Sequence, residues 1–187
     1  MHLEHTFEGR PFVLTGNYPY NISSQIFFKM LDYRNLIPCC TGMIQKEVAE
    51  RLAASPGCKA YGILRVLVQL YYKVDYLFTV EPGVFNPPPK VRSAVVRMTR
   101  NEVEHPGCDE DLLRRVVKTT FNQRRKMMRG SITPLLAELA QRCKGAAPNH
   151  TEFLAQPLLT RRPEQLSVAE FIDLTNLVAQ HYEGSLS

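Results

Sequence analysis

The first hundred residues alternate between strand-like and helix-like segments, and no other feature of the chain constrains its fold as strongly. Short apolar runs typical of buried strands occur at 12–16, 37–44, 74–80 and 93–99. Amphipathic or apolar segments between them predict helices at 24–31, 45–54 and 61–72. Strands that alternate with helices favour an α/β fold, in which a mostly parallel sheet is covered on both faces.

The pattern becomes helical throughout after His105-Pro106-Gly107. Three helices are predicted there, at 109–128, 132–144 and 167–182. The last of them begins with Ser167 and Glu170, which are spaced as in a capping box. We therefore predict two domains, an α/β domain over residues 1–104 and a small all-α domain over residues 105–187.

Composition narrows the classes of partner and compartment. The net charge of +5 and the pI near 9.0 suit a polyanionic partner. Neither an apolar run of membrane-spanning length nor a signal peptide is apparent, so a cytoplasmic location is expected. Five cysteines without a Cys-x-x-Cys spacing indicate reduced thiols rather than a disulfide framework or a zinc site. The dispersed histidines show no metal-binding spacing either, so no metal is expected.

The tetrad Asn17-Tyr18-Pro19-Tyr20 follows directly on the first predicted strand. An Asn side-chain oxygen and the carbonyl oxygen of the Pro can accept hydrogen bonds from both N–H groups of an exocyclic amine. This arrangement aims the lone pair of the amine nitrogen at a methyl group. The Tyr20 ring can stack on the base, and Phe85, in a stiff proline-rich loop, is the candidate for the opposite wall. The alternative is that Asn and Pro simply form a turn.

Basic and polar side chains recur along the predicted helix 109–128 at spacings of 4, 4, 3 and 4, which place them on one face. They are Arg114, Lys118, Asn122, Arg125 and Arg129. Further positive charge comes from Arg124, Lys126 and, in the proline-rich loop, Lys90. Such a face is either merely solvated or binds an RNA backbone, and the absence of interleaved acids favours RNA.

Five sequence motifs, the tetrad among them, occur in the order known from one enzyme family. They are the tetrad with Asn21-Ile22-Ser23, then Gln45-Lys46-Glu47-Val48, Lys59-Ala60-Tyr61-Gly62, the run from Phe85 through Pro87-Pro88-Pro89 to Val96, and Phe121-Asn122-Gln123-Arg124-Arg125-Lys126. From about residue 3 to its end, the chain resembles the bacterial 16S rRNA adenine N6,N6-dimethyltransferases, the KsgA family. The erythromycin-resistance methylases share the tetrad, but the last two motifs resemble the KsgA branch better.

The resemblance implies a Rossmann-like methyltransferase sheet and S-adenosyl-L-methionine as the methyl donor. The implied reaction places two methyl groups on each of two adjacent adenosines near the 3′ end of 16S rRNA in the small ribosomal subunit. Asn17, Pro19 and Tyr20 would hold the target base, Phe85 would form the opposite wall, and Asn17 would also lie near the cofactor. Tyr18 departs from the usual Leu at an apolar position, where we expect it to be tolerated.

A larger departure concerns the methyl-donor site. Members of the resembled family carry a glycine-rich donor loop in an additional N-terminal part of the methyltransferase domain, whereas no Gly-x-Gly occurs in this chain. We expect little or no methyl transfer by this chain alone. We also expect an exposed strand at 12–16 that can pair with another chain. The alternative function is a non-catalytic RNA- or ribosome-binding module.

Overall fold

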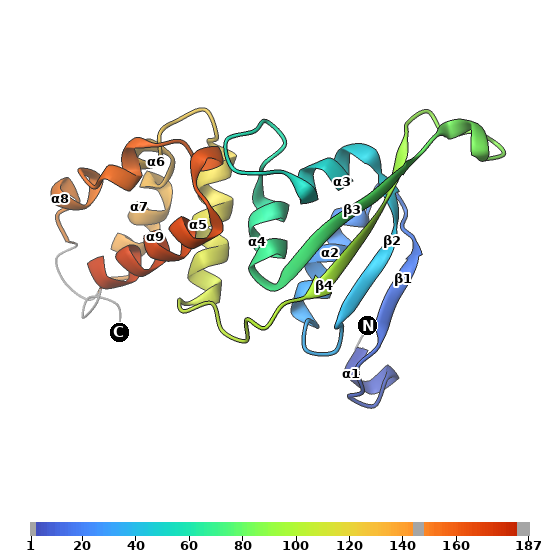
Figure 1. Ribbon diagram of the computed structural model, residues 1–187. Coiled ribbons are helices and arrows are strands. Elements are labelled where there is room, and N and C mark those ends of the chain that lie inside the picture. The colour runs from blue at the N-terminus through green and yellow to red at the C-terminus, as the bar shows by residue number, and fades with distance from the viewer. Residues whose placement is uncertain (1–2, 144–147, 183–187) are drawn as a thin grey trace. The chain divides into compact units, whose positions relative to one another are not determined.

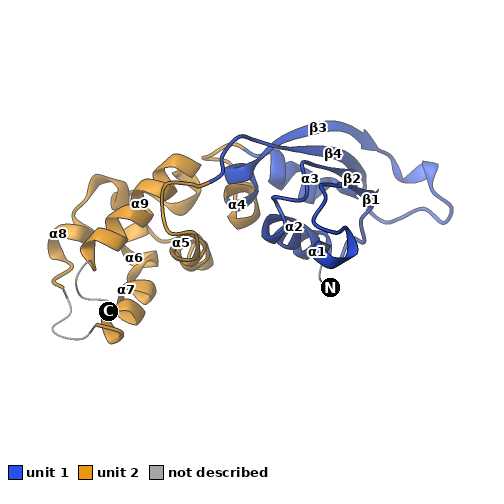
Figure 2. Cartoon of the chain, turned by 90° about the horizontal axis from the view of Figure 1, so that it is seen from below, with its two compact units in different colours: residues 1–54, 67–104 blue, residues 55–66, 105–187 orange. Residues whose placement is uncertain are grey.

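The computed structural model describes residues 3–143 and 148–182, which form two compact units (Figures 1 and 2). Unit 1 comprises residues 1–54 and 67–104, and unit 2 comprises residues 55–66 and 105–187. The division passes through helix α4 (Ile63–Tyr71). The predicted single boundary at residue 104 therefore assigns segment 55–66 to the α/β domain, whereas in the structure this segment groups with the helical C-terminal part.

Unit 1 contains a mixed four-stranded sheet in the order β1-β2-β4-β3. Its strands are β1 (Val13–Asn17), β2 (Cys39–Gln45), β3 (Tyr72–Val80) and β4 (Ser93–Arg100). Only β1 and β2 pair in parallel, and β4 is antiparallel to both of its neighbours. The prediction of a mostly parallel sheet is therefore wrong. The physical reason is that β3 and β4 are joined by a loop with one short turn, η1 (Pro82–Val84), and no crossover helix to return the chain in parallel.

One face of this sheet is covered and the other is open. Side chains at alternate positions, including Cys40, Val96 and Met98, are buried. Helices α2 (Ser23–Asp32) and α3 (Lys46–Ala53) lie behind the strands in Figure 1. On the other face Val13 is 57% exposed and Phe78 is 55% exposed. The prediction of a sheet covered on both faces is therefore wrong for the described residues, in which the strands alternate between core and solvent.

The helices and strands predicted in the first hundred residues are all present. Their ends differ from the predicted ends by no more than two residues. The structure adds a short N-terminal helix, α1 (Leu3–Thr6), to the predicted elements. Hydrophobic periodicity thus located these elements correctly, although it did not determine how the strands pair.

Unit 2 is built from helices around an apolar core of aliphatic and aromatic side chains. Its further elements are α5 (Glu110–Asn122), α6 (Met128–Ser131), α7 (Thr133–Gln141), α8 (Thr151–Leu154), η2 (Pro157–Thr160), η3 (Pro163–Gln165) and α9 (Val168–His181). The rings of Phe121 and Phe171 stack with their centroids 5.8 Å apart, which joins α5 to α9. The predicted capping box is confirmed at α9, where the Ser167 hydroxyl accepts a hydrogen bond from the Glu170 N–H.

The long helix predicted over 109–128 is interrupted after Asn122. The Arg124 N–H donates to the Phe121 carbonyl and the Lys126 N–H to the Gln123 carbonyl, so the chain turns here. Met128 is fully buried, and its N–H donates to a carbonyl outside the helix, that of Arg161, at 2.7 Å. Tertiary contacts of Met128 thus override the helical periodicity. The next helix ends at Gln141, and the predicted end at Lys144 lies outside the described residues.

Two features are absent from the part of the chain that the structure describes. No helix there combines the length and apolar character that a membrane span requires. Nor do three or more His, Cys, Asp or Glu side chains gather where they could hold a metal ion.

Candidate functional site

The tetrad lies at the edge of the sheet where the parallel strands end. Asn17 is the last residue of β1 and pairs with Met43 of β2. Gln45 and Val80, the last residues of β2 and β3, both pair with Ser93. The carboxyl ends of β1, β2 and β3 therefore meet at one edge, which is where open α/β sheets usually bind ligands.

Tyr18 anchors the tetrad in the core. Its side chain is only 5% exposed, and its ring meets Phe27 edge-on at 5.6 Å. The phenol oxygen lies 3.2 Å from Cys40 Sγ and 3.2 Å from the Thr41 carbonyl oxygen. The Tyr18 N–H donates to the Met43 carbonyl at 2.9 Å. Burial, together with the Cys40 contact, raises the pKa of the Tyr18 phenol, so the hydroxyl remains a neutral hydrogen-bonding group.

Asn17 and Pro19, on either side of this anchor, are both exposed. Among the described residues the Asn17 side chain makes no hydrogen bond. The Pro19 carbonyl accepts one hydrogen bond, from the Ile22 N–H at 3.2 Å. A carbonyl oxygen has two lone pairs, so Pro19 keeps one for an external donor. The two residues that supply the acceptors of the predicted chemistry are therefore both exposed.

Tyr20 is half-buried, and its hydroxyl shares a hydrogen bond with the Ser93 hydroxyl. Ser93 is fully buried at the start of β4. The Ser23 hydroxyl donates to the Tyr20 carbonyl at 3.5 Å. Sequence reasoning missed Ser93, which the resemblance motifs contain but which no local signal connects to a tyrosine 73 residues earlier.

Phe85 follows η1 in the loop between β3 and β4, at the same edge of the sheet as the tetrad. It is half-buried, and its N–H donates to the Pro82 carbonyl at 3.1 Å. An ion pair between Arg92 and Glu81, at 3.2 Å, joins the two ends of the loop. Within the described chain, no ring contact joins Phe85 to Tyr20. The structure thus brings the two aromatic residues to one edge without stacking them.

Most of the predicted RNA-binding residues are exposed, and those beyond residue 104 all belong to unit 2. Lys118 and Asn122 lie on α5, Arg125 and Lys126 in the following turn, and Arg129 on α6. Arg114 is half-buried on α5, and Lys90 is exposed in the loop of unit 1. Because α5 ends at Asn122, these side chains do not share one continuous helix face, contrary to the prediction.

Arg124 has a structural role that the sequence did not reveal. Its guanidinium donates to the Lys59 carbonyl at 2.7 Å and to the Cys58 carbonyl at 3.0 Å. Its Nε lies 3.7 Å from a carboxylate oxygen of Glu164. Glu164 in turn accepts a backbone hydrogen bond from Gly57. Arg124 therefore ties the segment 57–59 to the rest of unit 2.

Next to these contacts lies a hollow of about 430 Å³ within unit 2. It is lined by Gly57, Cys58, Lys59, Arg124, Arg125, Arg162 and Glu164. Four of these residues are basic and only one is acidic, which suits an anion such as a phosphate. Lys59 and Arg162 were absent from the predicted RNA-binding set. Lys59 stands in the motif Lys59-Ala60-Tyr61-Gly62 of the resembled family, so for this residue a signal was present in the sequence.

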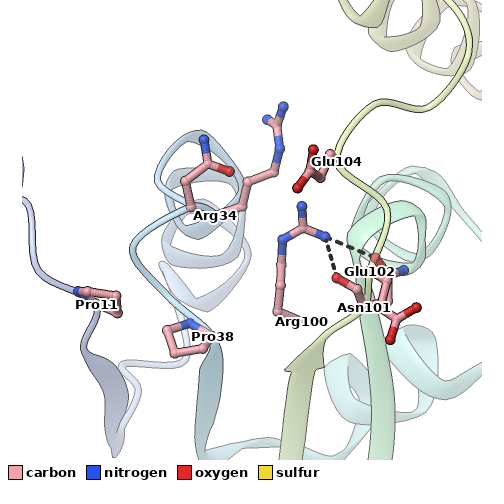
Figure 3. Close-up of a pocket in the computed structure, with 8 residues that line it drawn as sticks. Pro11, Arg34, Pro38, Arg100, Asn101, Glu102 and Glu104 are labelled. Atoms are coloured by element: carbon pink, nitrogen blue, oxygen red, sulfur yellow. Dashed lines mark hydrogen bonds between the residues drawn. The ribbon is translucent and has the colours of Figure 1, made fainter.

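A second hollow, of about 420 Å³, lies at the opposite end of the sheet (Figure 3). Arg34 and Arg100 line it, and both place their guanidinium groups over the Tyr71 ring, at 4.2 and 5.1 Å. Arg100 also donates to the carbonyl and the side-chain oxygen of Asn101, as the dashed lines show. These internal contacts indicate that the arginines fasten the strand ends, so we assign no ligand to this hollow.

Comparison with known proteins gives the family. Residues 3–178 match the model of the family described as "Ribosomal RNA adenine dimethylase". The chain belongs to this family. The Phocaeicola vulgatus "Ribosomal RNA small subunit methyltransferase A" is 64% identical over 178 residues, which cover 95% of this chain and 60% of that protein. The chain thus spans about three fifths of the length of this curated family member.

Solved structures support the same fold. A dimethyladenosine transferase from Plasmodium falciparum superposes with a TM-score of 0.77 at 28% identity, covering 90% of this chain and 67% of that one. The 23S rRNA methyltransferase ErmE superposes with a TM-score of 0.56 at 20% identity, over 89% of this chain and 66% of that one, which supports the fold alone. Unit 1 therefore has the Rossmann-like sheet of this family, in the part that the chain covers.

The family implies a methyl donor, and the candidate contact to it among the described residues is Asn17. Asn17 is exposed at the carboxyl end of β1. β1 is an edge strand and pairs only with β2 in the described sheet. The described residues therefore offer no glycine-rich turn beside this edge to cradle a nucleoside, so they do not fit S-adenosylmethionine on their own.

Proposed function

We propose that this chain carries the target-base side and the RNA-binding surface of a 16S rRNA adenine dimethyltransferase. Its reaction is the dimethylation of two adjacent adenosines near the 3′ end of the small-subunit RNA, with S-adenosylmethionine as donor, in the cytoplasm. The observation that carries this proposal is that Asn17 and Pro19 are both exposed at the sheet edge, on either side of the buried Tyr18.

The proposed chemistry needs positioning and no strong base. The adenine amine is a poor nucleophile because its lone pair is delocalised into the ring. Hydrogen bonds from its two N–H groups to Asn17 Oδ1 and to the Pro19 carbonyl favour a tetrahedral nitrogen with a directed lone pair. Tyr20 then stacks on the base, which has first left any helical stack, and Phe85 closes the opposite side.

The RNA-binding role rests on charge. Exposed basic residues in unit 2 include Lys118, Arg125, Lys126 and Arg129. The hollow beside Arg125 adds Lys59 and Arg162. Such residues bind phosphates without reading sequence, so they position the RNA, and the tetrad selects the base. Lys90, in the loop that carries Phe85, would add one backbone contact near the target base.

We expect this chain alone to lack most of the binding site for the methyl donor. S-adenosylmethionine supplies an electrophilic methyl group, and Asn17 is the candidate contact to it within the described residues. The open edge beside β1 favours a second candidate function for the isolated chain, that of a non-catalytic module that binds RNA or the small ribosomal subunit.

Calorimetric titration of S-adenosylmethionine into the purified 187-residue chain tests the donor part of this proposal. We expect no binding, together with retained binding of a 16S 3′-end RNA fragment. Donor binding at micromolar concentration would contradict our account of the donor site, and turnover on small ribosomal subunits would show that the chain is a complete enzyme. If the chain binds no RNA in any buffer, the proposed RNA-binding role is contradicted.

A further inference from the structure

We propose that Ser93 is a positioning residue, which orients the Tyr20 ring for stacking on the target adenine. The inference rests on the proposed function of the tetrad and assigns a role to a residue outside it. The main observation in its support is the hydrogen bond between the hydroxyl groups of Tyr20 and Ser93.

Ser93 is suited to act as a fixed point. It is fully buried, and its backbone pairs with Gln45 on one side and with Val80 on the other. A residue whose strand is paired on both sides in this way has little freedom to move, even at the end of the strand. Its hydroxyl therefore occupies one place relative to the ends of β2 and β3.

Tyr20 needs such a fixed point because it lies beyond the end of β1. It belongs to a turn closed by the hydrogen bond from the Ile22 N–H to the Pro19 carbonyl. The two side-chain torsions of a tyrosine in a turn are not determined by the backbone alone. The bond to Ser93 fixes the far end of the ring and so selects one orientation. A ring that is already oriented loses less conformational entropy when a base stacks on it.

The same bond connects the tetrad to the loop that carries Phe85. Ser93 is the first residue of β4, directly after this loop, and Val80 at the other end of the loop pairs with it. The position of Tyr20 is thus set by the strand that also holds the base of the loop. Ser93 does not contact the adenine amine in this account, and it acts only through the tyrosine.

A double-mutant cycle on the full chain tests the proposal. The probe is a short single-stranded RNA with 8-vinyladenosine at the position of the target adenine. This analogue keeps the 6-amino group that the tetrad is proposed to hold, and its fluorescence is quenched when the base stacks. The variants are Ser93→Ala, Tyr20→Phe, and the two together, with Tyr20→Ala as the reference for lost stacking. The matched control is Ser131→Ala, which removes the hydroxyl of another fully buried serine, in unit 2.

We expect Ser93→Ala and Tyr20→Phe each to lower the quenching to roughly half of the wild-type value or less. The double variant should be no worse than either single variant, because both remove the same bond. Overall affinity for the RNA should change by less than about threefold, since the phosphate contacts of unit 2 remain. Ser131→Ala should leave the quenching unchanged.

Unchanged quenching in Ser93→Ala, or a loss that adds to that of Tyr20→Phe, would overturn the proposal. If Ser93→Ala does not fold, Tyr20→Phe tests the same hydrogen bond by removing its other hydroxyl. Full quenching in Tyr20→Phe would equally contradict the proposal. If the wild-type chain binds the RNA without any quenching, the proposed role of the tetrad fails and this inference fails with it. Quenching in the wild type that survives Ser93→Ala rejects this inference alone.

Discussion

Gly42 and Tyr18 occupy complementary space under the tetrad. A Cβ on Gly42 would lie 2.1 Å from the Gly16 carbonyl oxygen and 2.6 Å from Cε2 of Tyr18. A Cβ on Gly16, the residue paired with Gly42, would have only Tyr18 nearby, at 3.9 Å. These two glycines, paired across neighbouring strands, thus differ sharply in whether they can accept a side chain. Only a Cβ on Gly42 would meet backbone of the neighbouring strand.

We predict that Gly42→Ala destabilises unit 1 by about 3 kcal/mol or more, since backbone must move to accept the methyl group. Gly16→Ala is the matched control, and we expect it to change stability by less than about 1 kcal/mol. Urea unfolding of both variants measures the difference. Equal stability of the two variants would show that β1 and β2 shift apart more easily than their pairing suggests.

Because the Cys40 thiol is buried, we predict that unit 1 loses stability at alkaline pH. Burial raises the pKa of its thiol to about 11, from an ordinary value of 9.0. Between these values the unfolded chain loses the proton and the folded chain retains it, so stability present below about pH 9 falls as pH rises. The loss over this window is roughly 2–3 kcal/mol. Tyr18, whose phenol also has a raised pKa, adds to it.

Urea unfolding at about pH 8 and about pH 10.5 measures this loss. In Cys40→Ser, which retains a hydrogen-bonding group beside Tyr18, we expect a clearly smaller fall between the two pH values. An equal fall in the variant and the wild type would mean that the thiol does not contribute.

At the scale of elements, the turn after α5 separates two arginines that are neighbours in sequence. Arg124 donates to the carbonyls of Cys58 and Lys59, whereas Arg125 is exposed. We expect Arg124→Ala to destabilise unit 2 by about 1–3 kcal/mol, because it leaves the part-buried bond to the Cys58 carbonyl and the exposed bond to the Lys59 carbonyl unmade. Arg125→Ala should leave stability within about 0.5 kcal/mol and weaken RNA binding several-fold.

Thermal unfolding and RNA titration of both variants measure this division of roles. A reversal, with Arg125→Ala the less stable and Arg124→Ala the weaker binder, would contradict the assignment. The two side chains have the same chemistry, so the comparison isolates the effect of their positions in the turn.

The N-terminus of α9 provides a second test at this scale. The Ser167 hydroxyl accepts from the Glu170 N–H at 3.2 Å, and the Glu170 carboxylate accepts from the Ser167 N–H at 2.8 Å. We expect Ser167→Ala to cost about 1 kcal/mol in urea unfolding. Ser187→Ala, beyond the described residues, is the control for losing a serine hydroxyl. A cost near zero would mean that α9 is held by its packing alone.

For the whole molecule, the basic character of the chain predicts salt-sensitive association. The net charge is +5, and exposed basic side chains gather in unit 2. RNA affinity should fall on the order of tens-fold between about 50 and 200 mM salt, and Arg125→Ala should reduce the slope of log K against log salt by about 0.7–0.9. Filter binding across a salt series measures both. A slope near zero would show that base stacking, and not phosphate contact, dominates binding.

Local signals in the sequence located most of the elements and placed the tetrad at the end of a strand. Apolar runs and helical periodicity predicted the strands and helices of unit 1, and the tetrad was placed at the end of the first strand because strand and turn are both encoded by neighbouring residues. The capping box of α9 was predicted for the same reason. The family motifs, being short and ordered, indicated a function without any knowledge of the sheet.

Tertiary structure decided what joins residues far apart in the chain. The antiparallel place of β4, the bond from Tyr20 to Ser93 and the binding of Arg124 to residues 58 and 59 connect positions that are tens of residues apart. The early end of α5 belongs here too, because burial of Met128 outweighs the helical pattern. By itself the sequence determined where most of the strands and helices form and which side chains they carry. Only packing decided which of those side chains meet, because strand order and burial depend on the free energy of the whole unit and not on any local pattern.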